Sequence, residues 1–181
     1  SRNLGMKKAK GRYITFIDSD DYWHRNYLKK TLNFLKKNDF HFVFTSYYWV
    51  NESGIKKGVF NVPEKVDYDY LLRTNPVSCL TRMYDKLKLG LILSPKLKIR
   101  QDYVFCLKIL KKIDFAYGLN TPLAYRRLRP NSLSNNKFIS AKYQFHVYYR
   151  IEKIGLIKSF YFLLNWFILG LLKHIRNYAT S

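Results

Sequence analysis

Residues 12–23 read RYITFIDSDDYW, and this stretch decides the fold that the sequence predicts. Residues 13–17 are apolar or β-favouring, and three carboxylates follow within four positions. A short unbroken apolar run predicts a strand buried on both faces, as in a parallel sheet. Ligands in open α/β sheets bind just beyond the carboxyl ends of the strands. Asp18, Asp20 and Asp21 therefore stand where such a fold places its chemistry.

Close carboxylates repel one another, and a bound cation relieves that repulsion. Oxygen ligands suit Mg²⁺ or Mn²⁺, and Mg²⁺ is commonly held by one or two carboxylates together with substrate phosphates. The residues therefore support a metal-bridged diphosphate site at the end of the strand. They equally support capping of the next helix by Asp18, Ser19 or Asp21, because such residues are common at helix starts.

The composition limits the class of protein. A chain of 181 residues has room for one domain with a sizeable core. Its 33 Lys and Arg against 12 Asp and Glu give a net charge of +21, which favours a nucleic acid, an anionic lipid or a phosphorylated substrate as partner. An aromatic content of 18% suits both nucleic-acid binding and a membrane surface. Cys79 and Cys106 lie far apart, which predicts reduced, structural thiols in the cytosol.

The remaining chain predicts a mixture of helices and strands. Helical spacing of apolar residues predicts helices at residues 25–37, 68–73, 84–89 and 138–151. Aromatic and β-branched runs predict strands at residues 40–46, 77–82, 115–117 and 123–127, and a hairpin-like turn at residues 51–54. A doubly buried strand needs neighbours and none precedes residues 13–17, so we expect the chain to begin partway through a larger domain.

Residues 1–5 (SRNLG) and 9–23 (AKGRYITFIDSDDYW) carry a resemblance. They resemble, almost position by position, the centre of family 2 glycosyltransferases of the GT-A fold, whose pattern is close to (A/S)RNxG followed by AxGxYIxFLDxDDxW. The resemblance implies an α/β, GT-A-like (Rossmann-like) fold with a mostly parallel sheet flanked by helices. It also implies that this fold is incomplete at the N-terminus, because the strands that bind the nucleotide base would precede Ser1.

Members of this family are inverting, metal-dependent enzymes that use nucleotide-diphosphate sugars. The resemblance implies that Asp20 is the principal ligand of Mn²⁺ or Mg²⁺, and that Asp18 also serves the metal while lying nearer the ribose. The implied contacts to the nucleotide sugar come from Arg2, Asn3, Asp18, Ser19, Asp21, Arg127 and Arg129. Trp23 and Gln101 are expected on the acceptor side.

Residues 98–105 (KIRQDYVF) open a predicted helix with Tyr103, Leu107 and Leu110 on one face. The family usually has Glu-Asp at this helix start, where the Asp is the catalytic base. Asp102 matches that Asp and Gln101 departs from the Glu. An inverting transfer needs a base for the proton of the attacking hydroxyl, and a carboxylate can serve. From the residue alone, Asp102 is better explained as a first-turn Asp that favours the helix dipole, because Asp is so common there. The resemblance is what favours the base.

Residues 127–134 (RLRPNSLS) resemble the family's Arg-x-His-x-x-Ser-x-Ser loop, which closes over the diphosphate. Arg127 matches the Arg, whereas Arg129 stands where many members carry His, so no metal-binding His is expected. The two arginines are expected to assist the leaving diphosphate electrostatically. The bare residues also suit a solvated basic loop.

The C-terminal segment differs in composition, since residues 154–175 are strongly apolar with basic flanks. The apolar run falls short of the roughly 20 residues that a spanning helix needs. It suits an interfacial helix on anionic lipid, with Trp166 and Phe167 at the surface, or a helix packed on the core. We therefore divide the chain into residues 1–135, the C-terminal portion of a GT-A catalytic domain, and residues 136–181, a helical extension expected to associate with membrane.

The expected function is metal-dependent, inverting transfer of a hexosyl or N-acetylhexosaminyl group from a UDP-sugar to a glycan or lipid-linked acceptor. The acceptor would be a growing cell-surface glycan such as a lipooligosaccharide or capsule. The expected location is cytoplasmic and peripheral, on the inner face of the cell membrane, and residues 1–181 alone are expected to be inactive. Two alternatives remain at this point, a basic nucleic-acid-binding module and an inactive membrane-associated scaffold. The first explains the charge but not the three carboxylates.

Overall fold

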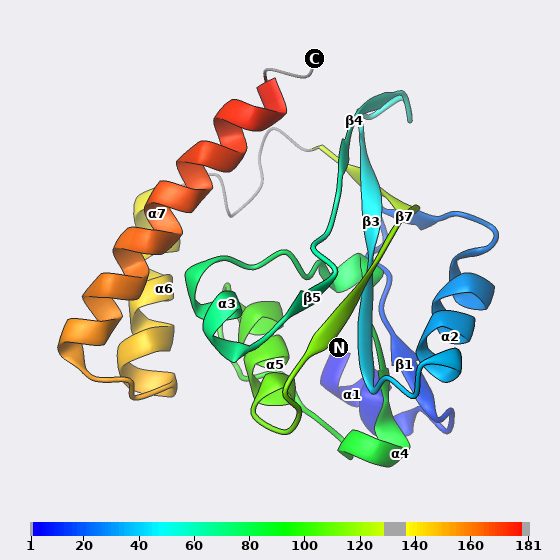
Figure 1. Ribbon diagram of the computed structural model, residues 1–181, viewed down its shortest axis with the longest axis horizontal. Helices are drawn as coiled ribbons and strands as arrows, with labels where there is room; N and C mark the ends of the chain where they lie inside the picture. The colour runs from blue at the N-terminus through cyan, green and yellow to red at the C-terminus, as the bar shows by residue number, and fades with distance from the viewer. Residues whose placement is uncertain (1, 129–136, 179–181) are drawn as a thin grey trace.

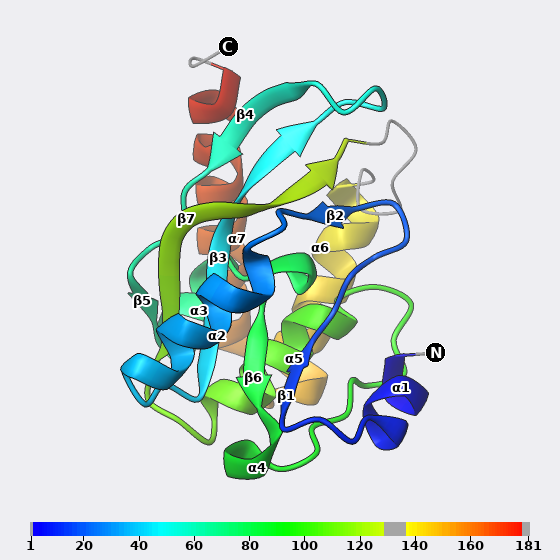
Figure 2. The ribbon, with the colours of Figure 1, turned by 90° about the vertical axis from the view of Figure 1, so that its right-hand side faces the viewer.

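The computed structural model describes residues 2–128 and 137–178, which form a mixed sheet flanked by helices. Helix α2 (Tyr27–Lys37) covers one face, and α3 (Tyr68–Arg73) and α5 (Gln101–Leu110) cover the other. Helices α6 (Lys137–His146) and α7 (Leu156–Tyr178) form a further layer beyond α3 and α5 (Figure 1). Figure 2 shows α2 lying across the sheet, with α1 (Arg2–Lys8) near the N-terminus beside β1 (Tyr13–Thr15).

The described residues form a seven-stranded sheet with the path β1-β6-β3-β7-β2, while β4 pairs with β3 and β5 with β7. The strands are β1 (Tyr13–Thr15), β2 (Tyr22–Trp23), β3 (Phe42–Val50), β4 (Lys56–Phe60), β5 (Lys65–Val66), β6 (Met83–Asp85) and β7 (Ala116–Arg127). Of these pairs only β3 with β7 is parallel. The α/β class is confirmed, but the expectation of a mostly parallel sheet is wrong for this part of the chain. The β3–β4 pair is antiparallel because a short hairpin joins its two strands, whereas the other antiparallel pairs bring together strands that are far apart in the sequence.

Strand β1 is shorter and more exposed than the sequence predicts. It ends at Thr15, only Ile14 is buried, and Ile17 is half exposed. Among the described strands β1 pairs with β6 alone, so its outer edge lacks the neighbour that double burial requires. The acidic turn does not cap the next helix, because β2 intervenes and Asn26 occupies the N-cap of α2. The capping alternative is therefore wrong.

Most other predicted elements are present with altered boundaries. The helix at residues 68–73, the helix after Arg100 and the hairpin between β3 and β4 are confirmed. The strands predicted at residues 115–117 and 123–127 are one strand, β7. The strand predicted at residues 77–82 is wrong, because Cys79–Thr81 form a 3-10 turn that precedes β6.

The helix predicted at residues 84–89 starts late for an identifiable reason. Asp85 ends β6, and its carboxylate accepts hydrogen bonds from the backbone N–H groups of Leu87 and Lys88. These bonds cap α4 (Lys86–Leu89), and Gly90 ends it with a φ of 77°. An Asp at an N-cap satisfies N–H groups that have no partner within the helix.

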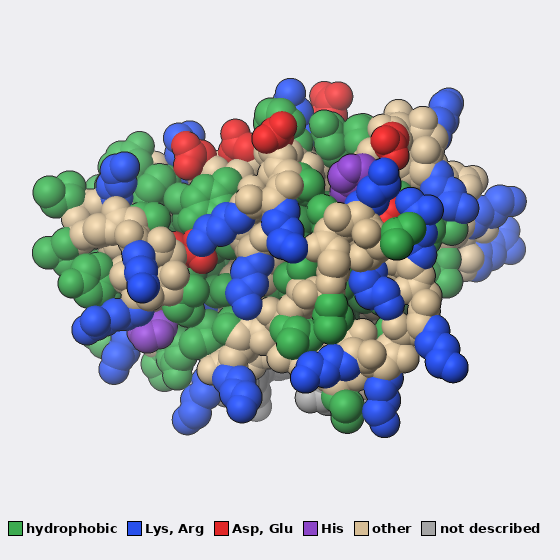
Figure 3. Space-filling model, turned by 90° about the horizontal axis from the view of Figure 1, so that it is seen from below, with side chains coloured by type: hydrophobic (Ala, Val, Ile, Leu, Met, Phe, Trp, Pro, Cys, Tyr) green, Lys and Arg blue, Asp and Glu red, His purple; other side chains and the backbone are tan. Residues whose placement is uncertain are grey.

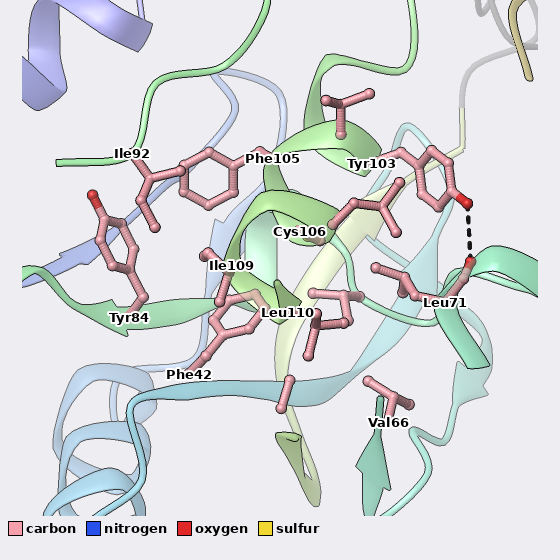
Figure 4. Close-up of a cluster of buried hydrophobic side chains, with 14 of the residues drawn as sticks. Phe42, Val66, Leu71, Tyr84, Ile92, Tyr103, Phe105, Cys106, Ile109 and Leu110 are labelled. Atoms are coloured by element: carbon pink, nitrogen blue, oxygen red, sulfur yellow. Dashed lines mark hydrogen bonds between the residues drawn. The ribbon is translucent and has the colours of Figure 1, made fainter. Parts of the chain in front are cut away.

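Helix α5 is the centre of the main core (Figure 4). Its residues from Tyr103 to Leu107 are all buried, as expected for a helix that is apolar all round. Alternation along β3 sends Phe42 and Phe44 toward α5 and Val43 toward α2, which is the period of two that a strand imposes. The sheet is thus covered on both faces, and α5 packs in the core on one of them.

The C-terminal segment is anchored in this same core. A π-helical segment, Val147–Ile151, follows α6, and Gly155 with a φ of 86° allows the turn into α7. Tyr148 and Phe162 bury their side chains in the main core cluster. The Tyr148 hydroxyl also donates a hydrogen bond to the Leu72 carbonyl. Within residues 2–128 and 137–178, no helix is both long and apolar enough to cross a membrane.

Candidate active site

The acidic turn after β1 opens onto a cavity of about 360 Å³. The cavity lies where the turn, the segment before β6, the start of α5, the end of β7 and the middle of α7 converge. Its charged or aromatic lining side chains are Asp18, Asp21, Tyr47, Arg100, Asp102, Arg126 and Trp166. Two of the three predicted acidic positions and the predicted base therefore face one space.

Arg2 joins two of these carboxylates directly. Its Nη1 lies 2.7 Å from each carboxylate oxygen of Asp102, and its Nη2 donates to Oδ1 of Asp18. Helix α1 (Arg2–Lys8) therefore ties the end of β1 to the start of α5. The resemblance assigned Arg2 and Asp18 to the nucleotide sugar, Asp18 also to the metal, and Asp102 to catalysis, and the structure places all three side chains in one ion-pair network.

Arg82 is a member of this network that sequence reasoning missed. Its side chain is fully buried, and its Nη2 donates to Oδ1 of Asp102 over 2.7 Å. Its Nη1 donates to the Asp102 carbonyl over 3.1 Å, and the guanidinium lies 4.3 Å from the Phe105 ring centroid. The available signal was a lone arginine within the apolar stretch at residues 77–83, because a buried charge requires a partner.

The two arginines set the ionisation of Asp102. Burial alone would raise the pKa of this carboxyl, but the positive charges of Arg82 and Arg2 outweigh it and hold the pKa below its ordinary value. Asp102 is consequently a carboxylate at neutral pH. Cys79 also lines the cavity, but burial raises its pKa to about 12, so it is a neutral thiol and a poor nucleophile. Asp102 is thus the better candidate for a base.

The acidic turn is itself tied to β7. The Asp21 N–H bonds the Asp18 carbonyl over 3.1 Å, and the Arg127 N–H donates to Oδ1 of Asp21 over 2.9 Å. Burial, with the charges of Asp20 and Asp18, raises the pKa of Asp21 despite that bond. Asp20 is partly exposed in the same turn. The network thereby fixes the direction in which the turn presents its carboxylates.

The carboxylates of the acidic turn fit a hard divalent cation only if water and substrate phosphates supply its other ligands. The described residues contain no group of three or more His, Cys, Asp or Glu side chains that could hold a metal ion by themselves. Mg²⁺ commonly takes one or two carboxylates and completes its shell with water and substrate phosphates. Asp18 and Asp20 supply such a pair, so the residues fit a cation that arrives with a diphosphate.

Three further predicted site residues, which do not line the cavity, make bonds to the protein backbone. Both polar atoms of the Asn3 side chain bond the Ser94 backbone, each over 2.9 Å. The Trp23 indole donates to the Leu80 carbonyl over 2.8 Å. Gln101 donates to the carbonyl four residues before it. These contacts brace the walls of the site, while Ser19 is exposed at the turn.

Two consecutive arginines at the end of β7 have different surroundings. Arg127 donates to the Glu52 carbonyl over 2.9 Å, in the turn between β3 and β4. Arg126 lines the cavity, with its guanidinium 5.0 Å from the Trp49 ring centroid. Strand alternation explains this difference and could have indicated it. The structure therefore brings Arg126, rather than the predicted Arg127, to the cavity, and Arg129 lies outside the described residues.

Helix α7 contributes an aromatic side chain to the site. Trp166 lines the cavity and lies 4.9 Å from the guanidinium of Arg100. The sequence suggested that Trp166 faces a membrane surface together with Phe167. The structure separates them, because Trp166 faces inward while Phe167 is half exposed. The C-terminal segment is therefore part of the site.

Comparisons with known proteins agree with this geometry. Residues 1–84 match the model of glycosyl transferase family 2. The putative teichuronic acid biosynthesis glycosyltransferase TuaG of Bacillus subtilis is 39% identical over 160 residues, which cover 88% of this chain and 64% of TuaG. The Escherichia coli enzyme WfgD, a UDP-Glc:alpha-D-GlcNAc-diphosphoundecaprenol beta-1,3-glucosyltransferase, is 34% identical over 182 residues, covering 100% of this chain and 71% of WfgD.

The chain spans roughly two thirds of the length of these relatives. Among solved structures, Staphylococcus aureus TarS in complex with UDP-GlcNAc is similar with a TM-score of 0.59 and 22% identity, over 81% of this chain and 43% of that chain. This similarity confirms the GT-A-like fold. The sequence relationship to WfgD, together with the family model, establishes that the chain belongs to the family 2 glycosyltransferases.

Proposed function

We propose that this chain forms the acceptor-side part of an enzyme that transfers a hexosyl or N-acetylhexosaminyl group from a UDP-sugar to a lipid-linked acceptor with inversion. The observation that carries this proposal is the placement of Asp102 and Asp18 on one cavity, with Arg2 between them. The Asp102 carboxylate is available for an acceptor hydroxyl. Asp18 belongs to the acidic turn, which suits a cation bound to a diphosphate.

In this mechanism Asp102 accepts the proton of the acceptor hydroxyl while the hydroxyl oxygen forms a bond to the anomeric carbon. The bond from that carbon to the diphosphate oxygen breaks, and its electron pair leaves with the nucleoside diphosphate. Attack opposite the leaving group inverts the anomeric configuration. Arg126 lines the same cavity and supplies positive charge for the departing diphosphate. A divalent cation held by Asp20 and Asp18 would supply further charge neutralisation there.

The names of similar proteins support the substrate classes. WfgD is named for a UDP-glucose donor and a diphosphoundecaprenol-linked acceptor, and TarS has been solved with UDP-GlcNAc. TuaG is named for teichuronic acid biosynthesis. We extend these classes to the present chain as a UDP-sugar and a lipid-linked glycan. The charge of +21 suits both, since each carries a diphosphate.

The first experiment measures transfer by the full-length enzyme. Labelled UDP-glucose and UDP-GlcNAc are each supplied with a polyprenyl-diphosphate-linked GlcNAc acceptor and Mn²⁺. We expect a labelled lipid product with a β-linkage, because the donor linkage is α, and we expect EDTA to abolish its formation. An α-linked product would contradict inversion. Undiminished transfer in EDTA would contradict the cation, and absence of transfer from every UDP-sugar would contradict the donor class.

We also propose that the outer face of α7 rests on an anionic bilayer. Phe160, Leu164, Phe167 and Leu171 recur along one side of the helix and are between 41% and 59% exposed. Figure 3 shows hydrophobic side chains, with Lys and Arg among them, at the end of the molecule that α6 and α7 form. Apolar area and basic residues together are what an interfacial helix requires. Such docking would bring the cavity to a lipid-linked acceptor.

Flotation with liposomes tests this docking. Truncation is unsuitable because Phe162 of α7 is buried in the core. The double variant Leu164→Asn/Phe167→Asn removes two outer side chains, each worth about 1.5–3 kcal/mol when fully buried. We expect at least a tenfold loss of binding to anionic liposomes. The control Ile55→Asn/Leu87→Asn removes two exposed apolar side chains elsewhere and should float normally. Equal flotation of both double variants would contradict the proposal, as would binding that is insensitive to salt and to anionic lipid.

A further inference from the structure

A second cavity, of about 240 Å³, adjoins the candidate active site. It is lined mainly by apolar surface, and its residues come from the start of α5, from α6 and from α7. Arg100, Trp166 and Gly170 line both cavities. The guanidinium and the indole therefore stand between the space that contains Asp102 and a mostly apolar space beside α7.

Arg100 lacks the partner that a partly buried cation normally has. Its Nε is buried without a hydrogen-bond partner, and its Nη2 lies 3.5 Å from the Ser140 carbonyl, a weak contact. No ion pair joins it to a carboxylate in residues 2–128 and 137–171, and the remaining residues include no Asp or Glu. Burial accordingly lowers the pKa of Arg100. An anion would satisfy this group, and Lys137 in the same lining would add positive charge.

The backbone holds Arg100 in this position. It immediately precedes α5 and has a φ of 70°, in the left-handed region that side chains other than Gly and Asn seldom adopt. Its side chain makes no capping bond with the helix. A sparsely populated conformation persists where the surrounding structure maintains it, and such positions cluster at ligand sites. In this conformation the guanidinium lies 4.9 Å from the ring centroid of Trp166 in α7.

The apolar side of the second cavity continues onto the surface of α7. Phe167 and Leu171 line the cavity and also belong to the exposed outer face of the helix. Three environments consequently follow one another: the exposed apolar face, the unpaired cation Arg100, and the cavity with the Asp102 carboxylate. A ligand that matches this order has a hydrocarbon chain, then an anionic group, then a hydroxyl-bearing sugar.

We propose that the cavity between α6 and α7 binds the isoprenyl diphosphate portion of the acceptor. Arg100, assisted by Lys137, binds the diphosphate, and the first isoprene units lie against Phe167 and Leu171. The acceptor sugar then reaches the cavity of Asp102. This inference rests on the proposed function and deepens it, since it assigns a site to the part of the acceptor that does not react.

Binding of farnesyl diphosphate to the full-length enzyme, measured by calorimetry, tests the site. Arg100→Asn is the informative variant because Asn tolerates the left-handed conformation. We expect this variant to bind farnesyl diphosphate about 10- to 100-fold more weakly, as for loss of hydrogen bonds to a charged group. Its affinity for UDP should stay within twofold of the wild type. Arg150→Gln, which removes the charge of an exposed arginine outside both cavities, should bind both ligands normally.

Two further probes separate the two halves of the ligand. Inorganic diphosphate and farnesol should each bind the wild type at least tenfold more weakly than farnesyl diphosphate. Phe167→Ser should weaken binding of farnesyl diphosphate but not of inorganic diphosphate. Inorganic diphosphate that binds as tightly as farnesyl diphosphate would mean an anion site without lipid recognition and would overturn the proposal.

Binding of farnesyl diphosphate tests this site, and sugar transfer tests the proposed function, so either proposal can fail without the other. Unchanged farnesyl diphosphate binding by Arg100→Asn overturns the site, even if the enzyme transfers sugar from UDP-sugars. An equal loss of UDP affinity would assign Arg100 to the donor and would also overturn it. If binding depends on Arg100 while the wild type transfers no sugar, the site stands and the proposed function fails.

Discussion

Replacing Asp102 by Asn in the full-length enzyme is expected to lower kcat by about 10²–10⁴-fold, the range associated with loss of a general base. The amide has nearly the same shape but cannot accept the proton of the acceptor hydroxyl. Donor binding should persist, because the side chains of the acidic turn and of Arg126 are retained. Steady-state transfer kinetics and UDP calorimetry on the same protein measure the two quantities separately.

The substitution also leaves Arg82 and Arg2 without the Asp102 carboxylate, although Arg82 keeps the Asp102 carbonyl and Arg2 keeps Asp18. A lower Tm is therefore expected, so kcat must be calculated from the concentration of folded enzyme. The matched control is Asp69→Asn, which removes a first-turn Asp from α3 outside the cavity. If both variants retain a normal kcat, Asp102 serves only the helix dipole and the network.

The lowered pKa of Asp102 predicts how the stability and the activity of the enzyme depend on pH. A carboxyl whose pKa is depressed in the folded state stabilises the fold above its unfolded pKa of about 3.9, and loses that contribution as the pH falls through the folded pKa. Asp102 is consequently ionised throughout the range from pH 5 to pH 8. Any decline of wild-type kcat/KM between pH 7 and pH 5 should then come from another group and should persist in the residual activity of Asp102→Asn.

Replacing Asp20 by Asn is expected to abolish cation-dependent transfer while the fold persists. Asp20 is a proposed oxygen ligand at the end of β1, and an amide is a weaker ligand for a hard cation than a carboxylate. Removing one of three neighbouring negative charges also relieves repulsion within the turn. Transfer assays across a Mn²⁺ titration, together with calorimetry of UDP in the presence of Mn²⁺, measure the loss.

The control for this substitution is Asp39→Asn, at an exposed turn residue with a φ of 51° that Asn also tolerates. It removes the same charge outside the cavity and should leave transfer unchanged. Transfer by Asp20→Asn at the wild-type rate and with the wild-type Mn²⁺ dependence would contradict the assignment. Rescue at high Mn²⁺ concentration would instead support it, since the missing ligand weakens binding without removing the rest of the site.

Local patterns in the sequence determined much of this protein. The spacing of leucines determined α2, the apolar run before Asp18 determined the strand at the site, and the β3–β4 hairpin followed from its turn residues. The sequence also located Asp102 at a helix start. Such features depend on contacts between residues a few positions apart, and these are visible in the order of the residues.

Only the tertiary structure decided which charges meet. Arg2 reaches Asp102 across 100 positions, and Arg82 reaches it as a buried partner from a segment that the sequence indicated as a strand. The choice of Arg126 over Arg127 depended on the register of β7, and the inward side of α7 depended on its packing against the body. Contacts of this kind follow from how elements pack, and no local periodicity encodes them.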